Sequence, residues 1–481
     1  MSLTNKAIGG VFWAFLERFG TQILQLVIFV VLARILEPAA FGLMGLLAVF
    51  IAVSQSISES GFSDALIQKK DADEVDFSSV FYINLLISTS IYGILFITAP
   101  FVAQFFSEPI LADLLRVLGL KFIISAFSLV QITKLMKEIK FKKLMLVKLP
   151  STLLGGFAGI FAAYEGWGVW SLVVQQLVDA SAFSIQIWIQ SKWIPKRVFD
   201  LKRVGKLFSF GSKMMIESIL YKLYKNFSEL VIGRNFSMAE VGFYTQANKI
   251  KQVPISNISS ALGKVTYPIL ADIQDQDARL KNAYKRIIRL IFLIVAPVMV
   301  GLVVLAEPLF VLLLTETWLP AVPYFQWLCV GGILYPVQSY NLNILKVKGR
   351  SDLFLYLGII KKLIGIAGIL FFIQISVLAL VMFRAGNAVF AYFINSYYSG
   401  RLIGYGVFEQ IRDIWKFITA AAFSGVITHF IIFAVELPML VTIGGGLIMG
   451  AIIYISLIWM FDRSMIESAG ELFQTARKKI K

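Results

Sequence analysis

Residues 33–42 read ARILEPAAFG, and residues 233–242 read GRNFSMAEVG. In each stretch an Arg is followed by an Ala five residues later and by a Gly three residues beyond that. The residues concerned are Arg34, Ala39, Gly42, Arg234, Ala239 and Gly242. Because the offset is 200 residues in every case, the two stretches indicate an internal repeat.

The composition around these stretches is that of a polytopic membrane protein. Of the 481 residues, 58% are hydrophobic and 15% are charged, and the mean hydropathy is +0.78. A soluble domain carries about 25% charged residues. The single Cys, Cys329, excludes an intrachain disulfide and a metal site built from several Cys. The single His, His429, lies in an apolar run, so we expect it to pack there and we expect no metal or organic cofactor.

An all-α fold is expected, since helices satisfy their own backbone hydrogen bonds in lipid. A helix needs about 20 residues to cross the bilayer core. Fourteen such segments are predicted, although two of them, 210–233 and 241–266, are too polar for hydropathy alone to identify. The predicted spans are 10–33, 41–57, 79–101, 114–133, 149–164, 169–191, 210–233, 241–266, 287–306, 320–345, 353–373, 376–400, 416–435 and 438–460.

Lys and Arg in the connections orient these spans, because cytoplasmic loops carry an excess of both. With the N-terminus inside, the cytoplasmic segments hold 31 Lys and Arg residues, and the external ones hold only Arg34 and Arg234. No signal peptide is recognised, so both termini are expected in the cytoplasm. The net charge of +16 is thus explained by topology, and no connection is long enough for a nucleic-acid-binding domain. This uneven distribution of Lys and Arg does not distinguish fourteen spans from twelve, because removing two adjacent spans leaves the orientation of the others unchanged.

The repeat and the topology agree. Shifting the first two spans by 200 residues aligns Glu17 with Glu217 and Ser56 with Ser256, and the aligned spans run in the same direction. The sequence therefore predicts a six-helix lobe at 1–200, a second at 201–405, and two extra transmembrane helices with a basic cytoplasmic tail at 406–481. Parallel repeats of this kind suit alternating access by rocking of two lobes around a central site.

Twelve Lys and Arg residues fall inside predicted spans, Lys121 among them. Each costs about 2.5–3.5 kcal/mol at a helix centre. Those in the first, seventh and eighth spans share a helix face with amides and acids, which predicts a water-filled cavity. An interfacial amphipathic hairpin at 210–266 is the alternative. The candidate site residues are the bases Arg18, Lys213, Lys222, Lys225 and Lys249, and the polar or coupling residues Glu17, Gln22, Gln25, Glu217, Glu229, Asn248 and Gln252.

The excess of bases in this set suits a pyrophosphate, which guanidinium and ammonium groups bind through charge-assisted hydrogen bonds. Lys213 with Glu217, and Lys225 with Glu229, are spaced i,i+4 and could partly neutralise each other. The acids could also bind a coupling proton or monovalent cation. No catalytic constellation is found.

Several stretches taken in order resemble the polysaccharide transporter family. They are LARILEPAAFGLMGLLAVF, ESGFSDALIQKKDADEVDFSSVFYINL, APFVAQFF, GWGVWSLVVQQ, LFSFGSKMM and ETWLPAVPYFQWL. This family consists of flippases for lipid-linked O-antigen or capsule repeat units, within the multidrug/oligosaccharidyl-lipid/polysaccharide exporter superfamily. The resemblance covers essentially the whole chain, and it implies a V-shaped fold of fourteen helices.

The resemblance also implies a function in surface polysaccharide biosynthesis (O-antigen of lipopolysaccharide, capsule or exopolysaccharide) in the bacterial inner membrane. The substrate would be an oligosaccharide joined through pyrophosphate to a polyprenol, and the partners would be membrane lipids, a polysaccharide polymerase and chain-length machinery. Arg18 matches, by location, a basic residue that faces the central cavity in related lipid II flippases. The spans 416–435 and 438–460 match the helices that form a lipid-tail groove in those relatives.

Two other functions are weighed against a flippase. A multidrug antiporter of the same superfamily would favour an acidic cavity for its cationic substrates, whereas this cavity is basic. An integral membrane polysaccharide polymerase or ligase would need charged external loops, whereas the external segments here are short and nearly free of charge. We therefore expect a transporter and not an enzyme.

Overall fold

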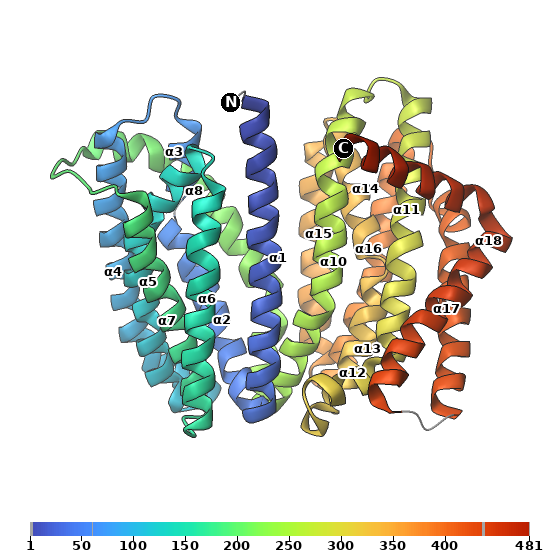
Figure 1. Ribbon diagram of the computed structural model, residues 1–481, viewed down its shortest axis with the longest axis horizontal. Coiled ribbons are helices and arrows are strands. Elements are labelled where there is room, and N and C mark those ends of the chain that lie inside the picture. The colour runs from blue at the N-terminus through green and yellow to red at the C-terminus, as the bar shows by residue number, and fades with distance from the viewer. Residues whose placement is uncertain (1–2, 60, 435–437, 481) are drawn as a thin grey trace. The chain divides into compact units, whose positions relative to one another are not determined.

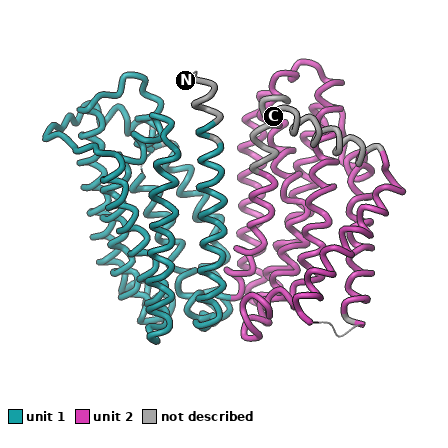
Figure 2. The backbone as a smooth tube through the Cα atoms, viewed as in Figure 1, with its two compact units in different colours: residues 1–242 teal, residues 243–481 magenta. Residues whose placement is uncertain are grey.

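The computed structural model describes residues 3–59, 61–434 and 438–480. Some of these residues are described by their backbone alone, namely 3–8, 11, 210, 213, 260–265, 267–269, 433, 464 and 466–480. Every regular element of the described residues is a helix (Figure 1). The chain forms two compact units, residues 1–242 and residues 243–481 (Figure 2).

The first unit is a bundle of long helices with two short ones. Within it α1 packs on α6, α6 on α7, α4 on α5, and α8 on α2, α3 and α4. The helices are α1 (Leu3–Ile35), α2 (Pro38–Glu59), α3 (Phe62–Gln68), α4 (Glu74–Phe106), α5 (Ile110–Lys137), α6 (Phe141–Tyr164), α7 (Trp170–Ser191), α8 (Leu201–Lys225), α9 (Phe227–Asn235) and the first turn of α10 (Met238–Asp272).

The second unit holds the rest of α10 and the helices that follow. Its α11 packs on α17, α17 on α18, and α16 on α13, α14 and α15. These elements are α11 (Asp277–Val304), α12 (Ala306–Leu313), the 3-10 helix η1 (Glu316–Trp318), α13 (Ala321–Gly332), α14 (Tyr335–Val347), α15 (Ser351–Phe372), α16 (Val377–Ile403), α17 (Val407–Ala434) and α18 (Met439–Ile480, with a kink at Asp462).

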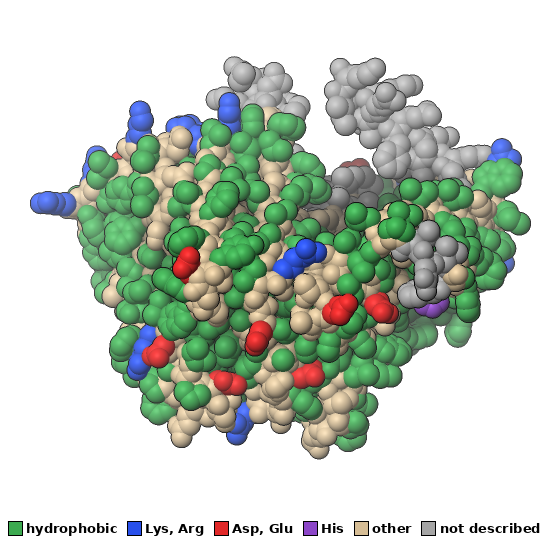
Figure 3. All heavy atoms as spheres, turned by 60° about the horizontal axis from the view of Figure 1, so that its bottom comes forward, with side chains coloured by type: hydrophobic (Ala, Val, Ile, Leu, Met, Phe, Trp, Pro, Cys, Tyr) green, Lys and Arg blue, Asp and Glu red, His purple; other side chains and the backbone are tan. Residues whose placement is uncertain are grey.

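The helices are those of a multi-pass membrane protein. Ten of the described helices are long and apolar enough to cross a membrane. Their outer faces carry large apolar side chains, such as Phe101 at 68% and Phe157 at 69% exposure, and hydrophobic side chains cover most of the face drawn in Figure 3. Four predicted spans are not among the ten. They correspond to α5, to α8 and α9 together, to α10, and to α13 and α14 together. The count of fourteen therefore stays a prediction.

Two predicted spans are interrupted in the structure. The span at 210–233 is instead a longer α8, which begins where the Asp200 side chain accepts hydrogen bonds from the Lys202 and Arg203 amides. It ends at Asn226, whose side-chain amide donates to the Lys222 carbonyl, and α9 follows. The span at 320–345 is broken between α13 and α14, where Pro336 lies in the first turn of the new helix and has no N–H to continue the old one.

The repeated glycines lie where α2 and α10 cross. A Cβ added to Gly42 would be 1.7 Å from the Met238 carbonyl oxygen, and one added to Gly242 would be 2.1 Å from the Pro38 oxygen. The surrounding helix ends repeat too, since α1 ends at Ile35 before α2 begins at Pro38, and α9 ends at Asn235 before α10 begins at Met238. Only glycine permits this reciprocal backbone approach. The layout of the whole repeat stays a prediction.

Replacing Gly242 by Ala should lower stability, because the new methyl group must push two helix backbones apart. We expect a loss of about 1–3 kcal/mol, measured as a lower Tm of the purified protein in detergent. Gly93→Ala on α4 is the matched control, since a Cβ there meets nothing within 4 Å. Equal Tm values for the two variants would contradict the close packing.

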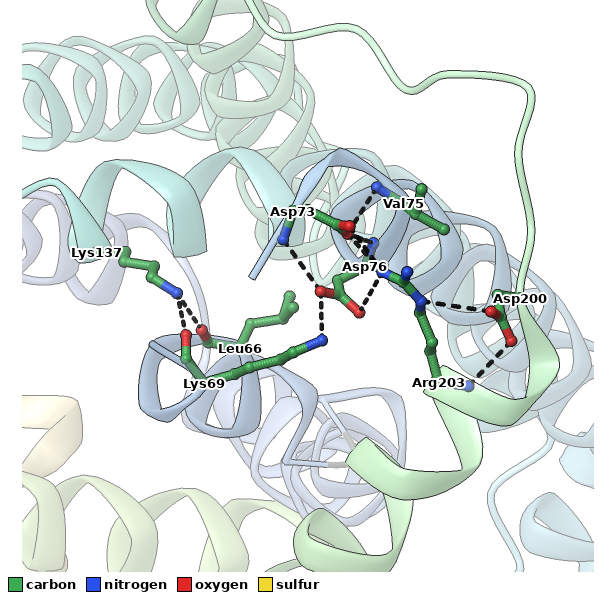
Figure 4. Close-up of polar contacts among 8 residues, drawn as sticks. All are labelled: Leu66, Lys69, Asp73, Val75, Asp76, Lys137, Asp200 and Arg203. Atoms are coloured by element: carbon green, nitrogen blue, oxygen red, sulfur yellow. Dashed lines mark hydrogen bonds and ion pairs between the residues drawn. The ribbon is translucent and has the colours of Figure 1, made fainter. Parts of the chain in front are cut away.

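The division into units differs from the boundary at residue 200 that the repeat predicts. The reason is that a polar cluster fixes the start of α8 to the first unit (Figure 4). Arg203 Nη1 lies 2.7 Å from Asp73 Oδ1 and 3.5 Å from Asp76 Oδ1, and Lys69 Nζ lies 2.6 Å from Asp76 Oδ2. Asp73 also caps α4 through the Val75 and Asp76 amides.

Hydrogen bonding by the Arg203 guanidinium holds the pKa of the Asp73 carboxyl well below its usual range. A depressed pKa gives stability that is fully present above the unfolded value of about 3.9 and is lost as the pH falls below it. The cluster is therefore intact at neutral pH.

Arg203→Gln should loosen the first turn of α8, because it removes an ion pair in which one guanidinium nitrogen, Nη1, contacts both carboxylate oxygens of Asp73. Hydrogen exchange of the amides in 201–206 should become faster, while exchange in α6 stays unchanged. Lys202→Gln is the control, since the Lys202 side chain is exposed and its backbone N–H makes the capping bond. Unchanged exchange in the Arg203 variant would show that the cluster does not hold α8.

Candidate functional site

The predicted polar residues of α1 lie in the first unit. Arg18 and Gln25 are exposed, whereas Glu17 and Gln22 are half-buried. Residues 12–35 of this helix form one of the candidate membrane spans. A guanidinium inside a span costs about 2.5–3.5 kcal/mol if it faces lipid, unless it reaches the membrane surface or meets a polar partner. Arg18 has exposed apolar neighbours on α1, such as Phe15 and Phe19, so a polar cavity at Arg18 stays a prediction.

The predicted residues of the seventh span lie on α8 and α9, also in the first unit. Glu217 and Lys225 are exposed, Lys222 is half-buried, and Glu229 is buried at 5% exposure. The side chain of Lys213 lies outside the described residues. The helix break at Asn226 separates Lys225 from Glu229, so the continuous helix that the i,i+4 pairing assumed is not formed there.

The remaining predicted residues belong to the second unit. On α10, Lys249 is exposed and Asn248 and Gln252 are half-buried. Within the first unit, α1 packs mainly on α6 while α8 packs on α2, so Arg18 and Lys222 are held by different helix neighbours. Among the predicted side chains that the structure describes, all except Glu229 are exposed or half-buried, and the single cavity that would unite them stays a prediction.

The structure adds a charged cluster that sequence reasoning did not assemble. Lys148, predicted in a cytoplasmic connection, lies instead within α6, and its Nζ is 2.9 Å from Asp179 Oδ2 on α7. Thr152 Oγ1 donates to the same carboxylate over 3.2 Å, and Lys121 Nζ on α5 donates to Gln176 Oε1 over 3.1 Å. The sequence already indicated that Lys121 needs a polar environment, because it is a charged residue inside a predicted span. Asp179 carried the same kind of signal, since it lies inside the predicted span 169–191, but it was not among the candidate residues.

The second unit contains an apolar groove of about 540 Å³ between α11, α12, α17 and α18. Gly301, Gly425, Gly446 and Gly450 lie along it, together with Pro297. A Cβ on Gly425 would meet Val300 at 2.5 Å, so the small residues let the helices approach closely. The groove lies on the two helices for which the family resemblance implied a lipid-tail groove, and α11 forms its remaining wall.

The described helices include candidate membrane spans, charged residues inside predicted spans and an apolar groove. Residues 31–323 match the family model described as "Polysaccharide biosynthesis protein", and the chain belongs to this family. This match confirms the resemblance to the polysaccharide transporter family that the sequence indicates.

Three curated relatives have 25–28% identity. The teichuronic acid biosynthesis protein TuaB of Bacillus subtilis (strain 168) is 26% identical over 74% of either chain. The lipopolysaccharide biosynthesis protein WzxC of Escherichia coli (strain K12) is 25% identical over 82% of either chain. The succinoglycan biosynthesis transport protein ExoT of Rhizobium meliloti (strain 1021) is 28% identical over 73% of this chain and 71% of its own.

Solved structures share the fold at lower identity. The lipid II flippase MurJ in an inward closed conformation matches with a TM-score of 0.76 and 15% identity, over 94% of this chain and 99% of its own. An inward-facing multidrug resistance transporter of the MATE family matches with a TM-score of 0.61 and 18% identity, over 79% of this chain and 95% of its own.

The α9–α10 connection offers a test of whether 210–266 crosses the membrane twice. Ser237 lies in this connection and is exposed. In a Cys329→Ser background, Ser237→Cys should react with an impermeant thiol reagent added outside intact cells. Asp275→Cys, in the exposed turn between α10 and α11, should react only after the cells are opened. Labelling of both positions only in opened cells would instead support the interfacial hairpin.

Proposed function

We propose that this protein is a flippase that moves polyprenyl-pyrophosphate-linked oligosaccharide repeat units from the cytoplasmic to the outer leaflet. The observation that carries the proposal is the exposed Arg18 inside a membrane-spanning helix of a polysaccharide transporter. The names of the relatives support the substrate class, since they concern teichuronic acid, lipopolysaccharide and succinoglycan. The MurJ-like fold supports the flippase mechanism.

The pyrophosphate is assigned to the bases of α1, α8 and α10. Arg18 offers a planar fork of N–H donors that matches two phosphate oxygens. Lys222 and Lys225 lie in the last turn of α8, and Lys249 lies on α10. An anion of more than one negative charge suits a set in which bases outnumber acids, and it would be repelled from an acidic cavity.

The polyprenol tail is assigned to the apolar groove of the second unit. This groove is lined almost entirely by carbon, from Leu293 on α11 to Ile458 on α18, and it is large enough for several isoprene units. A chain of branched hydrocarbon gains about 0.8 kcal/mol for each CH₂ group that it buries. The tail would thus stay in an apolar environment while the sugars cross.

Transport is proposed to occur by alternating access of two lobes, 1–200 and 201–405, with 406–481 adding the tail-binding helices. A proton or monovalent cation bound by Glu17, Glu217 or Glu229 would drive it. The location is the bacterial cytoplasmic membrane, with both termini inside. The polymerase and chain-length machinery would take up the flipped product.

Deletion of the gene in its native host tests the proposal. Surface polysaccharide should be lost, and polyprenol-linked repeat units should accumulate facing the cytoplasm. Normal surface polysaccharide, in a host without a second flippase, would refute the assignment.

Variants in the same strain test the pyrophosphate site. Removing one charge-assisted hydrogen bond costs about 1.5–3 kcal/mol, so Arg18→Ala and Lys222→Ala should each reduce export about tenfold or more. Arg18→Lys should retain part of the activity, because the charge survives without the bidentate geometry. Lys202→Ala, at an exposed position at the start of α8, is the control and should export normally. Wild-type export by well-expressed Arg18→Ala and Lys222→Ala proteins would exclude these residues from the substrate site.

A further inference from the structure

The first unit contains a cavity of about 440 Å³ between α1, α5, α6 and α7. This volume lies within the range of about 300–1,000 Å³ that small-molecule sites occupy. Four ionisable side chains line the cavity, one from each helix: Glu17, Lys121, Lys148 and Asp179. Ser125, Ser128, Phe141 and Phe183 also line it.

Two of these charges, Lys121 and Asp179, lie far from both ends of their helices. Asp179 is roughly 14 Å from the start of α7 and roughly 18 Å from its end, at 1.5 Å per residue. Its short side chain cannot reach the membrane surface, as a lysine near a helix end can. Ionisable groups at such depth are costly and are found where substrates or ions pass. The cavity therefore calls for a polar occupant.

The polar groups are fixed in place and retain bonding capacity. The ion pair between Lys148 and Asp179, together with the bond from Thr152, orients the carboxylate. Lys121 donates one described hydrogen bond, to Gln176, although an ammonium carries three donors. Glu17 is half-buried and lies within electrostatic range of the Lys148 ammonium. The cavity thus offers donors and acceptors together.

The charges of the cavity balance, with two bases and two acids, which sets it apart from the basic residues assigned to the pyrophosphate. A phosphate or a drug cation would meet as many repelling as attracting charges here. A sugar hydroxyl is both donor and acceptor, so it can bond to a carboxylate and to an ammonium at once. The rings of Phe141 and Phe183 supply apolar faces against which the C–H face of a sugar ring can pack.

We infer that this cavity binds sugar residues of the lipid-linked oligosaccharide, separately from its pyrophosphate. This inference rests on the proposed function, because it names the part of the substrate that the first unit recognises. The cavity would discriminate between repeat units by their sugars, whereas the pyrophosphate and the tail are common to all of them. Loss of the cavity should therefore affect long and short glycans differently.

Filling the cavity is the test, with Ser125→Phe as the variant. Ser125 is exposed to the cavity on α5, so a ring can be added there without replacing a buried side chain. Ser90→Phe, at an exposed position of α4 that does not line the cavity, is the matched control. Two lipids are compared: the complete repeat unit, and the polyprenol carrying only the first sugar, made in a host blocked at the second glycosyl transfer. Outward movement is measured as the fraction of lipid-linked sugar that brief cold periodate oxidises in intact spheroplasts.

Ser125→Phe should move the complete repeat unit about tenfold more slowly than wild type, while the one-sugar lipid moves at nearly the wild-type rate. Ser90→Phe should move both normally. Equal rates for wild type and Ser125→Phe, or an equal loss for both lipids, would overturn the sugar assignment. If the wild-type protein moves neither lipid, the proposed function itself fails.

A second variant covers the case in which Ser125→Phe does not accumulate in the membrane. Lys121→Met keeps the length of the side chain and removes its donors, so it should give the same selective loss for the complete repeat unit. Arg116→Met, one turn and a half earlier on α5 and paired with Asp113, is its control. Normal movement of both lipids by Lys121→Met would count against the sugar site.

Discussion

An ionised side chain inside a bilayer must have a partner or water, and this requirement organises both the fold and the proposed mechanism. Lipid offers neither, so every base within a span has to be paired, brought to a surface or turned toward a polar space. Lys148 is paired with Asp179, and Arg18 is exposed on α1. The outer faces, by contrast, are covered by large apolar side chains such as Phe157. The proposed mechanism therefore assigns substrate contact to the helix faces that carry these charges.

The proposed mechanism assigns different parts of one amphipathic substrate to different charged residues. The bases of α1, α8 and α10 are proposed to meet the pyrophosphate, and the balanced charges of the cavity in the first unit are proposed to meet uncharged hydroxyls. The carbon-lined groove between α11, α17 and α18 matches the hydrocarbon. A carrier with separate sites for the pyrophosphate, the tail and the sugars can change its sugar site while the other two sites stay the same. The names of the relatives concern different polysaccharides, which would need different sugar sites.

The sequence predicted the helical class, most spans and the polar character of the site residues, because hydrophobic runs and misplaced charges are local signals. It missed the break at Asn226 and the one before Pro336, since a helix that bends inside a membrane keeps its apolar composition. It also placed Lys148 in a loop, because six Lys residues in 134–148 read as a cytoplasmic segment. The partner of Lys148 is 31 residues away on the next helix, and only packing brings the two together. Arg203, at the start of α8, contacts Asp73 and Asp76 of the first unit, whereas the division of the chain at residue 200 stays a prediction.

The crossing of Gly42 and Gly242 has a consequence for how such a chain can change over generations. The contact is made by main-chain atoms of α2 and α10, so it depends on the absence of two side chains and on little else. Neighbouring side chains make packing contacts of their own, such as the buried Leu46 against Gly233, whereas the crossing itself requires that both glycines be kept. A gene that began as two copies could lose almost every other identity between them while the helices still crossed at the same point. Such a history would leave short segments of matching residues between two halves that otherwise differ, such as the stretches at 33–42 and 233–242.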